Sequence, residues 1–133
     1  MGTWNTGPFD NDDAMDLLDE IASPEFAFDD LQWAFDDPEY LGYVGGVFAI
    51  ALGALIRAVR GEPGAEAPEG FDLATFAGHV TAERVAWTRA QIDRALAGSK
   101  ESELYELWEE APRLDEWLHA SRAAIPSDTG EAP

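Results

Sequence analysis

The sequence contains no cysteine and very few basic residues. Without cysteine the chain forms no disulfide, has no thiolate nucleophile and builds no cysteine-ligated zinc site. Lysine and arginine together number 8 against 27 aspartates and glutamates, and the formal net charge is −19 at pH 7. So acidic a chain lacks the basic face that a phosphate backbone or an anionic membrane surface attracts. The composition therefore argues against binding of nucleic acid and against docking on a membrane.

Recognisable catalytic motifs are also missing. The chain has no Gly-x-Ser-x-Gly sequence and no glycine-rich phosphate loop followed by lysine. Glu116 and His119 form one Glu-x-x-His pair, which carboxylate-bridged di-iron bundles use twice together with two further glutamates. The second histidine, His79, has Phe76 three residues before it instead of glutamate. We therefore predict no metal site, no cofactor and no enzymatic activity. A small helical enzyme or metal-binding protein that uses His79 or His119 with carboxylates is an alternative.

No long hydrophobic segment of the membrane type is present. The first residues form neither a basic region nor an apolar stretch, so we expect no secretory signal. Residues 40–56 are uncharged, but this run is at the lower limit of a spanning helix and contains four glycines. Acidic residues precede it, where a membrane anchor favours lysine or arginine. We interpret it as a buried core helix of a cytoplasmic protein.

Enough apolar residues are present for one packed domain. The chain has 133 residues, of which 46% are hydrophobic. We predict a single helical domain over residues 1–126 and a disordered tail over residues 127–133. An irregular arm should precede the first helix, and its Trp4 and Phe9 are too large to remain in water. The arm is therefore expected to pack on the body of the domain.

Helical periodicity dominates the pattern, and no strand-like alternation of useful length appears. A first helix is predicted from Asp10 or Asn11, and a second from Ser23-Pro24 to the stop at residues 36–38. A long apolar helix should run from about Tyr43 to Arg60 and end at Gly61. Shorter helices are expected near residues 71–80, 81–97, 102–110 and 112–125. The fold class is therefore all-α, a bundle that we expect to contain five or six helices.

Small residues share one face of the long apolar helix. Gly45, Ala49 and Gly53 recur at intervals of four, and such a face lets another backbone approach closely. That backbone belongs either to the same chain or to a second subunit. The protein is therefore expected to be a monomer, or a homodimer through this face.

Two segments resemble a known family. Residues 1–14, MGTWNTGPFDNDDA, are similar to the opening of a bacterial family catalogued as domain of unknown function 4259. Residues 102–110, SELYELWEE, look like that family's Ser-Glu-Leu-x-x-Leu-Trp stretch. One departure is Asn5, where the family pattern favours glycine. The likeness covers roughly residues 1–125 and implies a small helical bacterial protein, without implying an activity.

The negative charge is concentrated near the N-terminus. Residues 1–40 contain twelve acidic residues and no lysine or arginine. One interpretation is a solvated acidic surface, as a salt-rich environment favours. The other is a docking face for a cationic partner, because such a field steers association. The face would comprise Asp10, Asp12, Asp13, Asp16, Asp29, Asp30, Asp36 and Asp37.

On this second interpretation the protein is an interaction module, such as an immunity-like or antitoxin-like inhibitor of a basic protein. A nucleic-acid mimic, whose carboxylates imitate phosphates on a DNA-binding partner, is a related alternative. Mimicry predicts ordered rows of exposed acids, whereas adaptation to salt predicts an even spread.

Overall fold

The computed structural model describes residues 5–127, which fold into seven helices with no strand among them. This confirms an all-α single domain, but the expected count of five or six helices was wrong. The second half of the chain forms four separate helices, one in each of the four stretches expected to be helical, with interruptions near Gly78, Gly98 and Pro112. The seven elements are α1 (Asp12–Ala22), η1 (Phe28–Phe35), α2 (Tyr43–Val59), α3 (Leu73–Ala77), α4 (Ala82–Ala95), α5 (Glu103–Glu109) and α6 (Leu114–Arg122).

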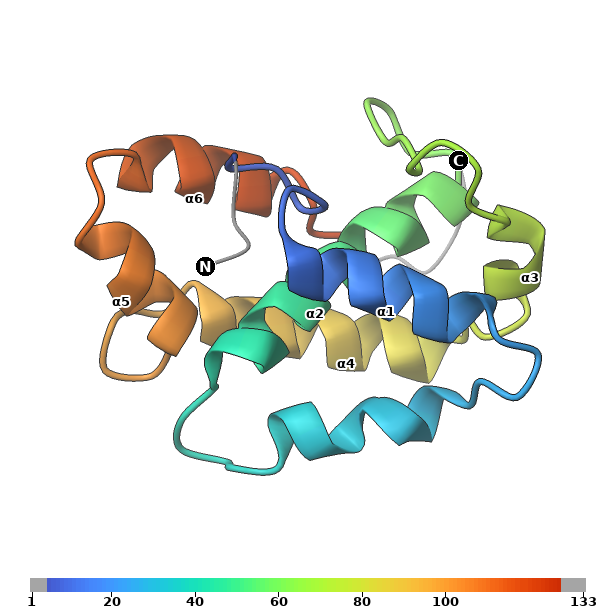
Figure 1. Ribbon diagram of the computed structural model, residues 1–133, viewed down its shortest axis with the longest axis horizontal. Coiled ribbons are helices and arrows are strands. Elements are labelled where there is room, and N and C mark those ends of the chain that lie inside the picture. The colour runs from blue at the N-terminus through green and yellow to red at the C-terminus, as the bar shows by residue number, and fades with distance from the viewer. Residues whose placement is uncertain (1–4, 128–133) are drawn as a thin grey trace.

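Helix α2 lies at the centre of the domain (Figure 1), where it contacts α1, η1, α3, α4 and α5. Every residue from Gly45 to Ile56 is buried, so the helix is surrounded by protein on all sides. This explains the uncharged run of residues 40–56, because a helix that is apolar all round belongs in a core. Within residues 5–127, no helix combines the length and apolarity that crossing a bilayer requires.

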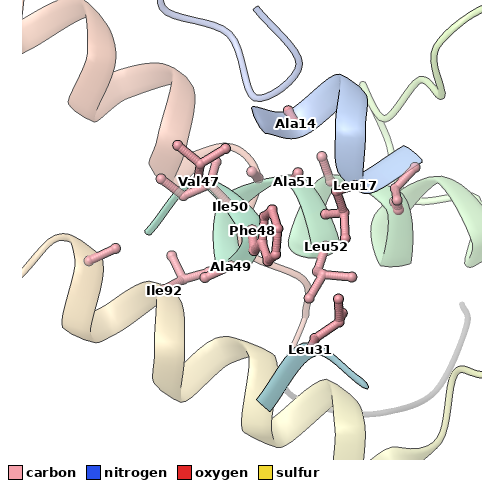
Figure 2. Close-up of a cluster of buried hydrophobic side chains, with 14 of the residues drawn as sticks. Ala14, Leu17, Leu31, Val47, Phe48, Ala49, Ile50, Ala51, Leu52 and Ile92 are labelled. Atoms are coloured by element: carbon pink, nitrogen blue, oxygen red, sulfur yellow. The ribbon is translucent and has the colours of Figure 1, made fainter. Parts of the chain in front are cut away.

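The core forms where α1, η1 and α4 meet α2 (Figure 2). Leu17 of α1, Leu31 of η1 and Ile92 of α4 are each fully buried. Their side chains surround the middle of α2, including Phe48 and Leu52. Burying a large aliphatic or aromatic side chain contributes about 1.5–3 kcal/mol. The packing of apolar stripes against α2 therefore accounts for the arrangement of the helices.

Most helices begin at a capping side chain. The Asn11 carboxamide oxygen accepts a hydrogen bond from the Ala14 N–H at 2.7 Å, which starts α1 as predicted. Thr81 and Ser102 cap α4 and α5 in the same way. Helix α2 ends at Val59 with Arg60 as its C-cap, and Gly61 follows with a φ of 66°. The capping residues and Gly61 therefore predicted these helix ends correctly.

The second helix differs from the prediction. Ser23 does not start it, because the Ser23 N–H donates to the Glu20 carbonyl and closes α1. The chain turns after Ser23, and η1 begins only at Phe28 as a 3-10 helix. The Asp30 carboxylate accepts a hydrogen bond from the Ala27 N–H at 3.2 Å and supports this start. The apolar stripe of this segment is nevertheless buried, as expected.

The described part of the N-terminal arm packs on the body. Phe9 is half-buried against the core, and the Asp10 carboxylate accepts a hydrogen bond from the Gly7 N–H at 2.9 Å. Trp4 and residues 128–133 of the predicted tail lie outside the described residues.

Residues 124–127 form a C-terminal segment that lies against α2 and α4. Pro126 is fully buried, and its carbonyl accepts a hydrogen bond from Arg89 of α4. The Ser127 carbonyl accepts from Arg60 at 3.0 Å, and its N–H donates to Glu62 at 3.3 Å. Three side chains therefore hold this segment in place.

The small-residue face of α2 is filled by the same chain. A Cβ atom on Gly53 would lie 2.6 Å from the Ala124 carbonyl oxygen, and one on Gly45 would overlap the Ala34 carbonyl. Ala49, between them, is fully buried. The close-approaching backbone thus comes from η1 and from the C-terminal segment, and a homodimer through this face would have to displace them.

Candidate functional site

The eight aspartates of the predicted docking face lie in three groups along the chain. The first group surrounds the start of α1, the second lies at the start of η1, and the third follows the end of η1. Six of the eight are exposed, whereas Asp10 and Asp13 are half-buried. A 3-10 helix rises roughly 2 Å per residue, so the two groups on η1 are separated by about 16 Å. The structure therefore does not bring the eight residues into one cluster.

No acidic residue of the first forty has a cationic partner in the described part of the chain. The ion pairs there are Arg57–Glu62, Arg60–Glu62 and Arg113–Glu116. Several of the early carboxylates instead accept backbone hydrogen bonds; Asp37, for example, accepts from the Glu39 N–H at 2.9 Å. Within residues 5–127, therefore, no ion pair neutralises a carboxylate of this region.

The carboxylates of α1 lie close enough to one another for their negative charges to interact. Burial raises the pKa of Asp13 above its ordinary value, and the negative charges of Asp16 and Asp12 raise the pKa further. Asp12, Asp16 and Asp19 are all exposed on this helix. Their spacing of four and three residues places them in a row along one side of α1.

The third acidic group borders a groove of about 450 Å³ between the end of η1 and the start of α2. In Figure 1 this is where the loop after η1 (cyan) turns back into α2, beside α5. We call it the Trp33 groove. It is lined by Trp33, Ala34, Asp36, Asp37, Tyr40, Gly42, Tyr43, Val44, Gly45 and Glu103.

Aromatic side chains of the groove remain open to solvent. Trp33 is 59% exposed and Tyr40 is 37% exposed, and Met15 is the only other large hydrophobic side chain exposed to this degree among the described residues. The Trp33 ring is anchored on one side, because it makes a T-shaped contact with the Phe48 ring, with centroids 5.9 Å apart. An exposed but anchored indole is suited to contact with a partner.

Hydrogen bonds from other helices hold the groove in shape. Arg94 of α4 donates to the Asp37 carbonyl, and the Leu41 N–H donates to the Glu101 carbonyl at 2.7 Å. The Glu103 carboxylate accepts from the Tyr43 N–H at 2.8 Å, which caps α2 because Gly42 has no side chain for this role. The walls are therefore fixed by contacts with α4 and α5.

The groove has a negative electrostatic environment. Loss of solvation raises the pKa of Tyr40 above 10.0, and the charges of Glu103 and Glu106 raise it further. The Tyr40 phenol therefore stays neutral at physiological pH. The groove offers neutral aromatic faces and carboxylates, a combination that recognises cations.

The two histidines are not brought into a site of this kind. His79 follows α3 and packs edge to face on Phe26, with ring centroids 5.0 Å apart. His119 is exposed on α6, and the nearby Glu116 carboxylate binds Arg113 at 2.8 Å. Across residues 5–127, no three histidine, aspartate or glutamate side chains are grouped so that they could hold a metal ion.

Three residues of the groove were not predicted to belong to a functional site, namely Trp33, Tyr40 and Glu103. The sequence did indicate that Trp33 could be exposed, because this residue falls outside the stripe formed by the buried residues of η1. Nothing in the sequence indicated a role for Glu103, since it lies 60 residues from its partner Tyr43.

Together these features define a small all-α protein with an acidic, aromatic-lined surface groove. The model of a family described as a domain of unknown function (DUF4259) matches residues 2–120. Because the match spans most of the chain, the protein belongs to this family. No curated protein and no solved structure matches the chain.

Proposed function

We propose that this protein is an interaction module that binds a basic protein, in the manner of an immunity-like or antitoxin-like inhibitor. The observation that carries the proposal is the uncompensated charge of the N-terminal third. Its twelve acidic residues make no ion pair within the described structure, although three ion pairs form elsewhere. Carboxylates without a cationic partner keep their net negative charge, and its field accelerates and orients the approach of a cationic protein.

A nucleic-acid mimic is a second candidate, favoured by the row of Asp12, Asp16 and Asp19 on α1. Along the helix axis Asp12 and Asp16 are about 6 Å apart and Asp16 and Asp19 about 4.5 Å apart, so the row presents closely spaced negative charges. In this version the basic partner is a DNA-binding protein. Competition by duplex DNA for the same partner separates the two candidates.

The test is capture of partners from a lysate of the source organism at low and at high salt, identified by mass spectrometry. A basic protein should bind at low salt and be released at high salt, since salt screens exposed charges. If no specific protein is captured at either salt concentration, the proposed function is wrong.

Two charge-matched variants sharpen this test. The first alters the η1 region with Asp29→Lys and Asp36→Lys, and with Asp30→Asn and Asp37→Asn, which keep oxygen acceptors for the backbone. The second changes the net charge equally outside the N-terminal third, with Glu69→Lys, Glu109→Lys, Glu110→Gln and Asp115→Asn, all at exposed positions. We expect the first variant to lose the partner and the second to retain it. Equal loss in both would show that bulk charge alone governs binding and would contradict a docking face.

A further inference from the structure

The Trp33 groove, defined above, is left open by the part of the chain that the structure describes. Its walls combine apolar surface from Ala34 and Val44 with the exposed rings of Trp33 and Tyr40. Asp36 and Asp37 stand at its border and are exposed. Its volume of about 450 Å³ lies in the range of sites that take small ligands or a few side-chain groups.

Charge decides which kind of group fits. A purely apolar occupant would bury carboxylates without a partner, which is costly. A second copy of this chain would bring further negative charge, since each copy carries −19. The occupant must therefore carry positive charge together with an apolar stem.

The aromatic walls favour arginine over lysine. A guanidinium group is planar, stacks on aromatic faces and binds carboxylates through two parallel hydrogen bonds, whereas an ammonium group is a strongly hydrated point charge. The three methylene groups of arginine also suit the apolar wall. Trp33 supplies the ring type that attracts cations best.

We propose that the Trp33 groove is the docking site for an arginine side chain of the basic partner, stacked on Trp33 and bound by Asp36 and Asp37. This inference rests on the proposed function, because it names the group by which the partner is recognised. The groove is formed before binding, since Arg94 donates a hydrogen bond to the Asp37 carbonyl and the Phe48 ring packs against the Trp33 ring. A preformed site loses little conformational entropy on binding.

The test is an NMR titration of the full chain with capped pentapeptides that carry one central residue among alanines. The central residue is arginine, lysine, citrulline or norleucine. We expect the arginine peptide to shift the Trp33 indole signal and the Gly42 and Gly45 amide signals in a saturable manner. The Trp33 signal is identified by its loss in Trp33→Phe. Lysine should bind several-fold more weakly, and the two uncharged peptides should give no saturable shift.

Two variants locate the binding. Trp33→Ala should weaken the arginine peptide by about 3- to 30-fold, as expected for loss of a cation–π contact. Trp33 is mostly exposed, so this variant should keep its fold, which the dispersion of its amide spectrum verifies. Asp36→Asn with Asp37→Asn should weaken binding further. The charge-matched control, Glu66→Gln with Glu69→Gln in the exposed loop after α2, should leave it nearly unchanged.

Several outcomes would overturn the proposal. Equal weakening by the Glu66 and Glu69 control pair would mean that net charge alone attracts the peptide. Equal binding of citrulline or norleucine would mean that the groove selects shape or apolarity. A Trp33 shift that depends on protein concentration without peptide would assign the groove to a second copy. If a captured basic partner binds Trp33→Ala as tightly as the parent protein, the groove proposal fails while the proposed function stands.

Discussion

Gly53→Ala offers the sharpest test of how the domain closes around α2. Alanine is the better helix former by about 0.8–1 kcal/mol, so helix propensity alone predicts a gain in stability. In the structure, however, the new Cβ atom would lie 2.6 Å from both the Ala124 carbonyl oxygen and the Ile92 Cδ1 atom. Ordinary contacts of these types are about 3.3–4.0 Å, so the neighbours must move by roughly 0.7–1 Å.

The carbonyl cannot move freely, because Arg60 and Arg89 hold the residues that follow it. Overpacking of a core costs about 1–3 kcal/mol, and the fixed backbone places this site in the upper half of that range. After subtraction of the propensity gain, Gly53→Ala should lower the free energy of unfolding by about 1–2 kcal/mol. In urea, the midpoint should fall by about 0.5–1 M.

Gly46→Ala is the matched control on the same helix. Its Cβ atom would lie 3.0 Å from the Leu104 side chain, which can shift by a few tenths of an ångström. The gain in helix propensity and the cost of the close contact nearly cancel, so the free energy of unfolding should stay within about 0.5 kcal/mol of the parent value. If Gly53→Ala is as stable as the parent protein, the steric reasoning is refuted. If both variants are destabilised equally, the special role of the C-terminal segment is refuted.

Three other changes address helix caps and titrating groups. Asn11→Ala removes the acceptor of the Ala14 N–H and should cost about 1 kcal/mol in a urea titration, whereas Asn11→Ser should retain most of the stability. Hydrogen bonds from Thr75 lower the pKa of Asp72 below 3.8, so its stabilisation is present above that pH and is lost as the pH falls through the lowered value. Asp72→Ala should therefore flatten the stability profile at the acidic end, and an unchanged profile would contradict the assignment. Burial, followed by repulsion from neighbouring carboxylates, raises the pKa of Asp13 above 3.8, so the folded state is penalised once the pH rises through the raised value. Asp13→Asn should raise the urea midpoint at neutral pH and leave it unchanged near about pH 3.

The helix positions were predictable where a capping side chain precedes an apolar stripe. Asn11 marks the start of α1, and Gly61 marks the end of α2, because each residue satisfies a local requirement of the backbone. The burial of α2 was equally predictable, since a helix that is apolar all round belongs in a core.

The predicted start of the second helix was wrong because a serine can either begin a helix or end the one before it. Serine followed by proline is typical of a helix start, yet Ser23 here closes the preceding helix through its N–H. The spacing of Phe28, Leu31 and Phe35 is that of an α-helix, yet the segment forms a 3-10 helix. Tertiary packing decided between them, and periodicity contains no information on that packing.

The candidate site was only partly predictable for a related reason. The sequence shows that Asp36 and Asp37 are acidic and lie beyond an apolar stripe, and both are exposed. It does not show that the start of α5 returns to the start of α2, because this contact joins Glu103 to Tyr43 across 60 residues. Long-range contacts of this kind depend on how the whole core assembles.

The late position of the C-terminal segment has a consequence for synthesis. Helix α2 leaves the ribosome early, but the space beside Gly53 is not filled until Ala124 and the residues after it have been added. Nearly the whole domain must therefore emerge before the core closes. A chain that is stalled or cut before Ala124 would present the apolar surface of α2 to proteases and chaperones, so that cellular quality control can distinguish finished domains from incomplete ones.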